Sequence, residues 1–349
     1  MKQVKVGVVG AGRMGRNHCR VLSLLRHVDL VGISDLNAVA GATVATQYET
    51  QFFAQVDDLL ARVDAVTIAT PTPSHFALAL RCLKQGLHLF IEKPVTETLE
   101  QAETLAETVA LHDQVVQVGH IERFNPTFTE LKHVLENLTL AAIEFRRLSP
   151  YVGSNTDVDV VLDLMIHDLD LVLDLVGEQP STIAAYGLTA FSGAIDHAVV
   201  NLGFAHGPLF TVTASRLTEQ KVRSIEVTAL EGYIEGDLLN KQIAIHRSTI
   251  GEYLQQSSRS VKYRQESVVE RIHVPTAEPL FLELQHFVAC ILENSLPLVP
   301  ISHGLNVLEL AMQVRKLIYG NLADIGSWRA LNNIAHPHRQ VALAPMEIN

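Results

Sequence analysis

The feature that most constrains the fold is a glycine-rich turn near the start of the chain, in the stretch VVGAGRMGRNH. Gly10, Gly12 and Gly15 have the spacing G-x-G-x-x-G, between an apolar, strand-like run and a helical period. This context is typical of a dinucleotide-binding turn, in which a pyrophosphate approaches the backbone and the helix N-terminus stabilises its charge. Arg13 and Met14 lie inside the turn, so we expect them beside the cofactor too. The alternative is a glycine turn that holds no ligand.

The first 120 residues alternate between short apolar runs and helical periods. Strands are expected at Val4–Gly10, Asp29–Asp35, Ala65–Thr70, Leu87–Glu92 and Val115–His120. Helices are expected at Arg13–Leu25, Ala38–Tyr48, Ser74–Gln85 and Thr98–His112, the last two with Ser74 and Thr98 as N-caps. Apolar strands separated by helices predict a parallel sheet covered on both faces, which is a doubly wound α/β fold.

The pattern changes after His120. Helices are expected at Asn125–Asn137, Val160–Val176, Glu278–Glu293 and Ser302–Tyr319. Strands are expected at Thr139–Ser149 and repeatedly between Ser181 and about Val274. Consecutive strands without helices between them predict an α+β domain with a mainly antiparallel, open sheet. The expected domains are a dinucleotide-binding domain (1–121) and a substrate-binding and oligomerisation domain (122–349), whose last helices can pack back on the first domain. The polar stretch 251–270 is expected to be a flexible excursion, and the tail after about residue 321 has weak periodicity.

Charge and cysteine content narrow the classes of function. The net charge is −11, which disfavours nucleic acids and anionic membrane surfaces as partners. Cys19, Cys82 and Cys290 show neither a disulfide framework nor a metal-type spacing, so we expect no metal and a reducing compartment. The chain has no signal-peptide pattern and no apolar run of about 18 residues. These features together predict a cytoplasmic enzyme.

Two further segments belong to the expected cofactor site. Asp35 ends the second strand 20 residues after Gly15, where a carboxylate accepts hydrogen bonds from ribose hydroxyls and repels a 2′-phosphate. This favours NAD over NADP, and the alternative role for Asp35 is to cap the next helix. The segment TPTPSH leaves the carboxyl end of a core strand, so Thr70, Pro71 and His75 are expected to line the cofactor. His75 can equally be a helix residue that contacts no ligand.

The stretch HLFIEKPVTETLE places a lysine at the end of a buried strand. Pro94 restricts Lys93 to extended backbone, and the carboxyl end of the strand puts Glu92 and Lys93 at the cofactor edge. A lysine there can hydrogen-bond a substrate hydroxyl, and burial and nearby positive charge lower its pKa into a useful range. A solvated lysine at a strand end is the alternative.

A second polar motif lies in the apolar stretch VVLDLMIHDLDLVLDLVG. Asp163 and His167 are four residues apart and therefore share a face of an uninterrupted helix. Polar groups in such a helix need partners, which predicts a carboxylate and an imidazole facing a substrate, with Asp163 holding His167. Either His167 or Lys93 would take a hydroxyl proton; the alternative is a helix-end aspartate near a core histidine. The other three carboxylates of the stretch are expected to be exposed or capping: Asp168, Asp170 and Asp174.

Together these pieces resemble the Gfo/Idh/MocA family of nicotinamide-dependent oxidoreductases, over nearly the whole chain. The motifs that carry the resemblance are GAGRMG, TPTPSH, EKPVT and DLMIHDLD, in this order. The resemblance implies that Lys93, Asp163 and His167 surround the substrate carbon that loses a hydride. It also implies an N-terminal Rossmann domain, followed by an α/β domain whose open sheet forms subunit contacts. Family members often approach this helix through a Gly-rich segment, whereas this chain has DVDVVLDLM.

A narrower resemblance lies in VGHIERFNP and RRLSPY. Both are similar to the branch that oxidises the 3-hydroxyl of nucleotide-linked amino sugars such as UDP-N-acetylglucosamine. Glu122, Arg123 and Asn125 follow the last strand of the first domain and are expected to bind the substrate in the interdomain cleft. Arg123, Arg146 or Arg147 can pair with a diphosphate, because a guanidinium fork matches phosphate oxygens. A set of interdomain salt bridges is the alternative.

The expected function is hydride transfer from the carbon of a sugar hydroxyl to NAD, with a small, nucleotide-linked sugar as substrate. Two alternatives stay open. One is a dehydrogenase of a free polyol, an inositol or a dihydrodiol, or an enzyme resembling biliverdin reductase. The other is a non-catalytic regulatory protein that senses NAD. A homodimer or homotetramer is expected, because the edge of the second sheet needs covering.

Overall fold

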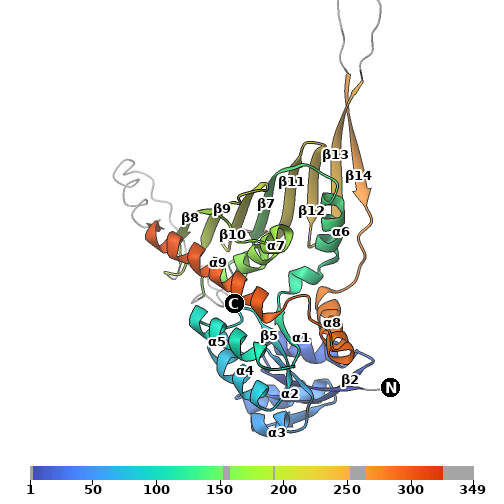
Figure 1. Cartoon of the computed structure of the whole chain (residues 1–349), viewed down its shortest axis with the longest axis vertical. Helices are drawn as coiled ribbons and strands as arrows, with labels where there is room; N and C mark the ends of the chain where they lie inside the picture. The colour runs from blue at the N-terminus through green and yellow to red at the C-terminus, as the bar shows by residue number, and fades with distance from the viewer. Residues whose placement is uncertain (1–2, 152–157, 192, 252–263, 325–349) are drawn as a thin grey trace, which may run out of the picture.

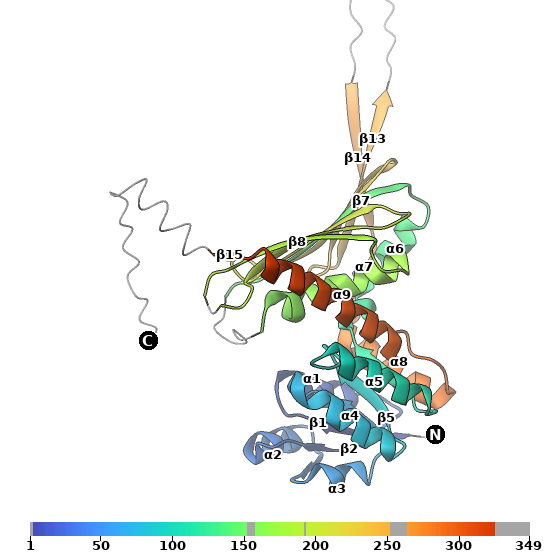
Figure 2. The same ribbon diagram turned by 60° about the vertical axis from the view of Figure 1, so that its left-hand side comes forward.

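The computed structural model describes residues 3–151, 158–191, 193–251 and 264–324. Within them, the chain forms two sheets with helices packed on and between them (Figures 1 and 2). A parallel sheet is followed by a second, mainly antiparallel one, which confirms the predicted fold class. The boundary between domains near residue 121 stays a prediction.

The first sheet is parallel throughout and has the strand order β3-β2-β1-β4-β5-β6. Its strands are β1 (Val4–Val9), β2 (Val28–Ser34), β3 (Gln51–Phe53), β4 (Ala65–Ile68), β5 (His88–Glu92) and β6 (Val116–Gly119). Its helices are α1 (Arg13–Leu22), α2 (Ala38–Gln47), α3 (Val56–Leu60), α4 (His75–Lys84) and α5 (Leu99–Ala110). The sequence did not predict β3 and α3, because both are too short to show a period.

This sheet forms because its central strands are apolar on both faces. Val6 and Val8 have no exposed surface, and such buried side chains each contribute roughly 1.5–3 kcal/mol. Thr98 caps α5 as predicted, since its side chain accepts a hydrogen bond from the Gln101 amide. Ser74 is the N-cap residue of α4 as predicted, but its side chain makes no capping hydrogen bond. A short 3-10 turn, η1 (Thr72–Ser74), precedes α4, and the Ser74 hydroxyl donates a hydrogen bond back to the Thr70 hydroxyl.

The second sheet has the order β14-β13-β12-β11-β7-β10-β9-β8-β15. Its strands are β7 (Leu140–Leu148), β8 (Thr182–Thr189), β9 (His197–Gly203), β10 (Leu209–Ser215), β11 (Val222–Ala229), β12 (Gly232–Asp237), β13 (Gln242–Gly251), β14 (Arg264–Ile272) and β15 (Ala323–Asp324). Neighbouring strands are antiparallel except β7 with β10 and β8 with β15. Figure 2 shows helices on one face of this sheet: α6 (Pro126–Leu135), α7 (Ile166–Val176) and α9 (Ile301–Gly320).

Two predictions about this half were wrong in detail. The stretch 251–270 is not all an excursion, because β14 begins at Arg264 and pairs with β13; residues 252–263 lie outside the described part of the chain. The predicted helix Val160–Val176 is not one α-helix. It begins with a π-helical turn, η3 (Val161–Met165), and continues as α7.

The C-terminal helices connect the two sheets. Helix α8 (Pro279–Glu293) packs on the first sheet, where Leu284 and Phe287 share a core with Val6 and Val8. Helix α9 packs on α5 and on the second sheet (Figure 2). The three cysteines are buried and unpaired. Among the described residues, no helix is long and apolar enough to cross a membrane, and no group of His, Cys, Asp and Glu could hold a metal ion.

Candidate functional site

The glycine turn between β1 and α1 has a shape that only glycine permits at two positions. Gly10 has φ 106°, and a Cβ there would lie 2.5 Å from the Ala69 carbonyl oxygen. A Cβ on Gly15 would lie 1.8 Å from the Gly10 carbonyl oxygen. In contrast, a Cβ on Gly12 would meet no atom within 4 Å. The turn is therefore tight inside and open at Gly12, which fits the approach of a pyrophosphate to the backbone.

Asp35 supports this turn from the end of β2. One carboxylate oxygen accepts a hydrogen bond from the Ala11 amide at 2.6 Å, and the other accepts one from the Asn37 amide at 2.6 Å. The cap of α2 is Asn37 rather than Asp35. Arg13 is exposed at the start of α1, and Met14 is half-buried against the core. Asp35 thus lies beside the open position of the turn, next to the Ala11 amide, and Arg13 is accessible to solvent.

His75 connects two loops of the same edge. Its Nε2 lies 2.8 Å from the Thr70 carbonyl oxygen and its Nδ1 lies 3.0 Å from the Pro94 carbonyl oxygen. The ring is buried, whereas Pro71 is exposed. Because backbone carbonyls occupy both ring nitrogens, His75 positions the loops after β4 and β5 and is not free to bind a ligand through its nitrogens.

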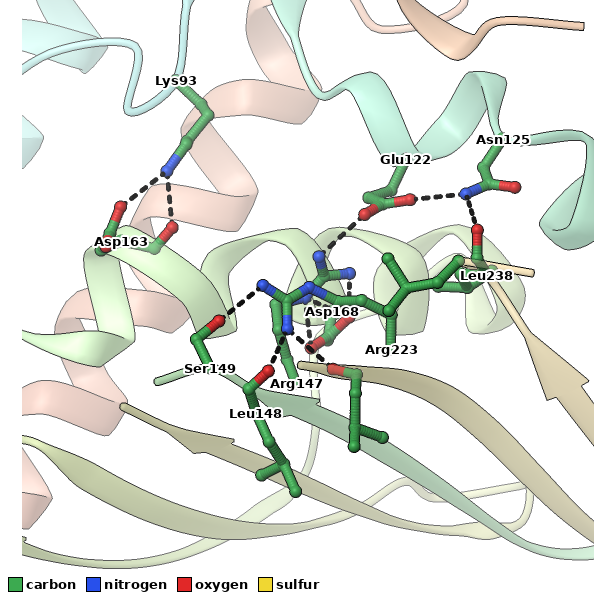
Figure 3. A network of polar contacts seen from close by, with 12 residues as sticks. Lys93, Glu122, Asn125, Arg147, Leu148, Ser149, Asp163, Asp168, Arg223 and Leu238 are labelled. Carbon is green, nitrogen blue, oxygen red and sulfur yellow. Dashed lines mark hydrogen bonds and ion pairs between the residues drawn. The ribbon is translucent and has the colours of Figure 1, made fainter. Parts of the chain in front are cut away.

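Lys93 lies where β5 ends, at a cis Lys93–Pro94 peptide bond. Its Nζ donates a hydrogen bond to the Asp163 backbone oxygen at 2.6 Å and lies 3.7 Å from the Asp163 carboxylate (Figure 3). Burial lowers the pKa of Lys93 below its usual value; Asp163 and Glu92 oppose this, and Arg147 and Arg13 add to it. The Lys93 side chain is still 16% exposed, so a small molecule can reach the amine.

Two buried carboxyl groups, Glu92 and Glu283, lie close to Lys93 in the structure. Glu92 is hydrogen-bonded to Nε2 of His18 at 2.9 Å, and His18 comes from α1. Glu283 of α8 is fully buried and neither of its carboxyl oxygens has a hydrogen-bond partner among the described residues. Burial, and then the charge of Glu92, raise the pKa of Glu283 well above its usual value. Burial thus favours the neutral, protonated form of Glu283, and Glu92 acts electrostatically on both Glu283 and Lys93.

The π-helical turn explains why Asp163 can meet Lys93. A π-turn widens the helix, so a carbonyl inside it can accept a bond from outside. Asp159 begins the turn: one carboxylate oxygen accepts hydrogen bonds from the Val161 and Leu162 amides, and the other from Arg315 of α9. Asp159 was not predicted as a functional residue. Its place two residues before an apolar helical run is a capping signal that the sequence contained.

His167 lies just past this turn. The predicted contact between Asp163 and His167 is not formed. The Nδ1 of His167 is buried without a hydrogen-bond partner among the described residues, and Asp163 bonds to Lys93 instead. The four-residue spacing misled because the intervening turn is not α-helical. Burial lowers the pKa of His167 well below its usual value, and the charges of Lys93 and Arg147 lower it further. His167 is therefore a neutral imidazole near Lys93.

The next element of the site is a buried ionic network. Arg147 of β7 donates one bifurcated hydrogen bond from Nε to both carboxylate oxygens of Asp168, and one from Nη2 to the same carboxylate. Its Nη1 donates to Glu122 at 2.8 Å (Figure 3). Asn125 donates to Glu122 at 2.9 Å and to the Leu238 carbonyl oxygen. Arg147 holds the pKa of Glu122 below its usual value despite burial. These predicted substrate residues therefore lie together, but they largely satisfy one another.

A parallel network surrounds Arg123. Its Nε lies 3.2 Å from each carboxylate oxygen of Asp170, and it also pairs with Asp174. His303 of α9 lies 2.7 Å from Asp170. The prediction that Asp168, Asp170 and Asp174 are exposed or capping was wrong, because each is an ion-pair partner of a buried arginine.

Arg146 is the predicted residue that the structure separates from the others. Successive residues of a strand point to opposite faces, and Arg147 faces α7. Arg146 is exposed and lies 4.0 Å from Glu226, so it belongs to the face of the second sheet without helices. This position gives no support to Arg146 as a diphosphate ligand, and that assignment stays a prediction.

The sequence analysis missed two residues of the site, His120 and Arg223. His120 directly follows β6, is 1% exposed, and has no hydrogen-bond partner at either ring nitrogen among the described residues. Burial lowers the pKa of His120 to about 4. Arg223 of β11 lies opposite Arg147 in the sheet. Strand alternation places Arg223 on a definite face only after the pairing of β11 with β7 is known, so no local signal marked it.

A parallel sheet with an open glycine turn, and a buried lysine beside it, together define a dinucleotide-dependent oxidoreductase. Residues 4–120 match a model described as "Oxidoreductase family, NAD-binding Rossmann fold", and residues 144–235 match the "GFO/IDH/MocA C-terminal domain". The UDP-N-acetylglucosamine 3-dehydrogenase of Acidithiobacillus ferrooxidans is 35% identical over 251 residues, 72% of this chain and 79% of that one. The chain belongs to the Gfo/Idh/MocA family and is a nicotinamide-dependent dehydrogenase that acts on a CH–OH group.

Other relatives act on inositols. The scyllo-inositol 2-dehydrogenase (NAD(+)) of Bacillus subtilis is 25% identical over 324 residues, 85% of this chain and 89% of that one. Among solved structures, the UDP-N-acetylglucosamine 3-dehydrogenase of Acidithiobacillus ferrooxidans has a TM-score of 0.82 and 31% identity, covering 91% of this chain and 98% of that one. The fold and the family are therefore shared with dehydrogenases of two kinds of substrate.

Proposed function

We propose that this protein transfers a hydride to NAD from the carbon that bears the 3-hydroxyl of a UDP-linked N-acetylamino sugar. The observation that carries the proposal is the position of Lys93, whose amine has a lowered pKa and is held by Asp163 at the cofactor edge. The relative that is named for this reaction and is 35% identical supports the choice of sugar.

Lys93 is the base in this proposal. A lowered pKa increases the fraction of neutral amine at neutral pH, and only the neutral amine can accept the hydroxyl proton. Asp163 positions the amine through its backbone oxygen and carboxylate. His167 is neutral and has a low pKa, so it suits a hydrogen bond to a sugar hydroxyl better than proton abstraction. The bound dinucleotide supplies the hydride acceptor.

We propose NAD rather than NADP as the cofactor. Asp35 places a carboxylate beside Ala11 in the glycine turn, at the end of β2. A 2′-phosphate on the ribose would approach this negative charge, whereas free ribose hydroxyls can donate hydrogen bonds to it. Leu36 and Asn37 follow, so no cation is adjacent in sequence.

A second candidate function is oxidation of a neutral polyol such as an inositol. The inositol dehydrogenases among the relatives favour it, and so does the pairing of Arg123 and Arg147 with carboxylates, which leaves neither as an open phosphate ligand. The non-catalytic, NAD-sensing alternative is disfavoured by the position of Lys93, because a sensor needs no base.

The test is an absorbance assay for reduced nicotinamide with NAD and matched substrate pairs. UDP-N-acetylglucosamine, free N-acetylglucosamine, UDP-glucose and myo-inositol are compared at equal concentration. We expect turnover with UDP-N-acetylglucosamine and little with the free sugar. Turnover with inositol alone would replace the proposal by the polyol function. Tight NAD binding without hydride exchange on any of these compounds would favour the sensor.

We also propose that the helix-free face of the second sheet forms the subunit contact of a homodimer or homotetramer. This face carries the exposed Arg146 beside the half-buried Glu226, and the exposed side chain of Tyr186. Light scattering coupled to size-exclusion chromatography should give at least twice the monomer mass of 38.4 kDa. A mass of one chain at micromolar concentration would contradict the proposal.

A further inference from the structure

The second sheet brings two buried arginines side by side. Strand β11 pairs with β7 in antiparallel register, and Arg223 lies directly opposite Arg147. Directly opposed residues of neighbouring strands point to the same face, which here faces α7. Two cations in this arrangement repel each other unless each has an anionic partner.

The carboxylates are shared unequally between the two arginines. Arg147 contacts both Asp168 and Glu122. Arg223 instead donates to three neutral acceptors: the Leu148 carbonyl oxygen at 2.6 Å, the Val222 carbonyl oxygen at 2.7 Å and the Ser149 hydroxyl at 2.9 Å (Figure 3). No carboxylate oxygen among the described residues forms an ion pair with Arg223.

The guanidinium of Arg223 is therefore only partly satisfied. A guanidinium has five N–H donors, and three donate to the acceptors just named. Arg223 is 9% exposed, so water replaces the missing partners poorly. Burial lowers the pKa of Arg223 to about 10, and the charge of Arg147 contributes to this. An anionic ligand would accept the remaining N–H bonds of Arg223 and would neutralise its buried charge.

Arg223 also lies near the reacting groups. Its charge acts on His167, whose pKa it helps to lower, and the charge of Asp163 acts on Arg223 in turn. In Figure 3, the end of the Arg223 side chain points toward Ser149, on the side of the drawn network where Asp163 and Lys93 lie. An anion bound at Arg223 would thus belong to the same molecule that reacts at Lys93.

We propose that Arg223 binds the phosphate attached to the anomeric oxygen of the sugar, and that it thereby selects glycosyl phosphates over neutral sugars. This inference rests on the proposed function, because it assigns a group of that substrate. The predicted phosphate ligands are less suited to the task. Arg123 and Arg147 are neutralised by carboxylates, and Arg146 lies on the other face. A planar fork with open donors matches phosphate oxygens well.

The test is calorimetric titration of the full chain, in the presence of saturating NAD, with N-acetylglucosamine 1-phosphate. Wild type is compared with Arg223→Gln, Arg223→Lys and the control Arg247→Gln. Arg247 of β13 pairs with Glu270 of β14 and donates to the Glu231 carbonyl oxygen. Glu231 contacts Thr139, just before β7, whereas Ser149 follows the other end of that strand. NAD affinity, measured separately, shows whether each variant is folded.

We expect Arg223→Gln to weaken binding by about 10- to 100-fold, the range for loss of charge-assisted hydrogen bonds, while Arg247→Gln binds like wild type. Arg223→Lys should fall between them, because an ammonium keeps the charge but not the fork. Equal binding by Arg223→Gln and wild type would overturn the inference. Two results with the wild type would also overturn it. One is no binding of N-acetylglucosamine 1-phosphate. The other is tighter, Arg223-dependent binding of glucuronate, a sugar carboxylate titrated for comparison.

The same proteins separate this inference from the proposed function. Turnover of UDP-N-acetylglucosamine by wild type tests the proposed reaction, and phosphate binding tests Arg223. Phosphate binding that depends on Arg223, without turnover, would support the anion site and contradict the proposed reaction. Turnover whose kcat and KM are both unchanged by Arg223→Gln would support the proposed reaction and contradict the anion site.

Discussion

The cofactor edge of the first sheet and the charged face of the second sheet are built by different means. At the cofactor edge, the shape comes from backbone: glycines at 10, 12 and 15, and amides held by Asp35. On the second sheet, it comes from charged side chains that meet across long sequence separations, such as the 47 residues between Arg123 and Asp170. A backbone site depends on local spacing, whereas an ionic network depends on how distant elements pack.

The comparison predicts that the cofactor edge is least tolerant of added volume. Gly15→Ala would put a methyl group 1.8 Å from the Gly10 carbonyl oxygen, so the turn must shift. We expect a loss of at least about 4 kcal/mol in the free energy of unfolding, measured by urea denaturation. Gly12→Ala is the control. Its Cβ meets nothing, so unfolding should be unchanged while NAD binding weakens. A stable Gly15→Ala variant would show that the turn adapts.

Lys93→Ala tests whether Lys93, at the end of β5 and facing the second domain, is the group that accepts the hydroxyl proton. Removing a positioned base typically lowers kcat by about 10²- to 10⁴-fold, and NAD affinity should remain near wild type. Stopped-flow absorbance of reduced nicotinamide measures the hydride-transfer step. Lys93→Arg should not rescue it, because an arginine stays protonated. Unchanged turnover in Lys93→Ala would remove Lys93 from the mechanism.

Asp168→Asn tests whether the ionic network of the second sheet stabilises the fold. It leaves the buried Arg147 with Glu122 alone, and breaking a buried pair typically costs about 3–5 kcal/mol. Asp57→Asn removes an exposed ion pair with Arg81 and should cost less than about 1 kcal/mol. Urea denaturation of both variants measures the difference. Equal, small losses would mean that the network contributes little to stability.

The pH dependence of kcat/KM distinguishes Lys93 from His167 as the base. Lys93 must be neutral to accept a proton, so kcat/KM should rise with pH by about tenfold per unit and level off above the pKa of Lys93. Because that pKa is lowered, the plateau should begin below pH 10.5. His167 titrates well below pH 6.5 and should add no limb near neutrality. A limb near pH 6.5 that reports on His167 instead would reverse the two roles.

Asp35→Asn should give the smallest effect, a shift in cofactor preference. The amide oxygen can still accept from Ala11, but the negative charge that disfavours a 2′-phosphate is gone. We expect NADPH affinity to rise by about tenfold relative to NADH, measured by the fluorescence of the reduced nicotinamide. Asp29→Asn, at the other end of β2, is the control and should change neither affinity. An unchanged ratio would mean that other groups set the preference.

Much of the fold could be predicted because its signals are local. Each of these signals spans only a few residues: strands that are apolar on both faces, capping residues such as Thr98, and the glycine turn. The errors came where the tertiary structure overrides local periodicity. The turn Val161–Met165 is π-helical rather than α-helical, and Lys93 donates to the carbonyl at Asp163 within it. This separates Asp163 from His167, which a regular spacing had joined.

The sequence by itself determined the order of the longer elements, the dinucleotide turn and the candidate status of Lys93, because each depends on neighbours along the chain. Only the tertiary structure decided which charges meet. It paired Arg147 with Asp168 and Glu122, turned Arg146 to the opposite face, and placed Arg223 beside Arg147 with neutral acceptors alone. The physical reason is that electrostatic interactions depend on distance in space and on burial, and strand pairing brings together residues that the sequence keeps far apart.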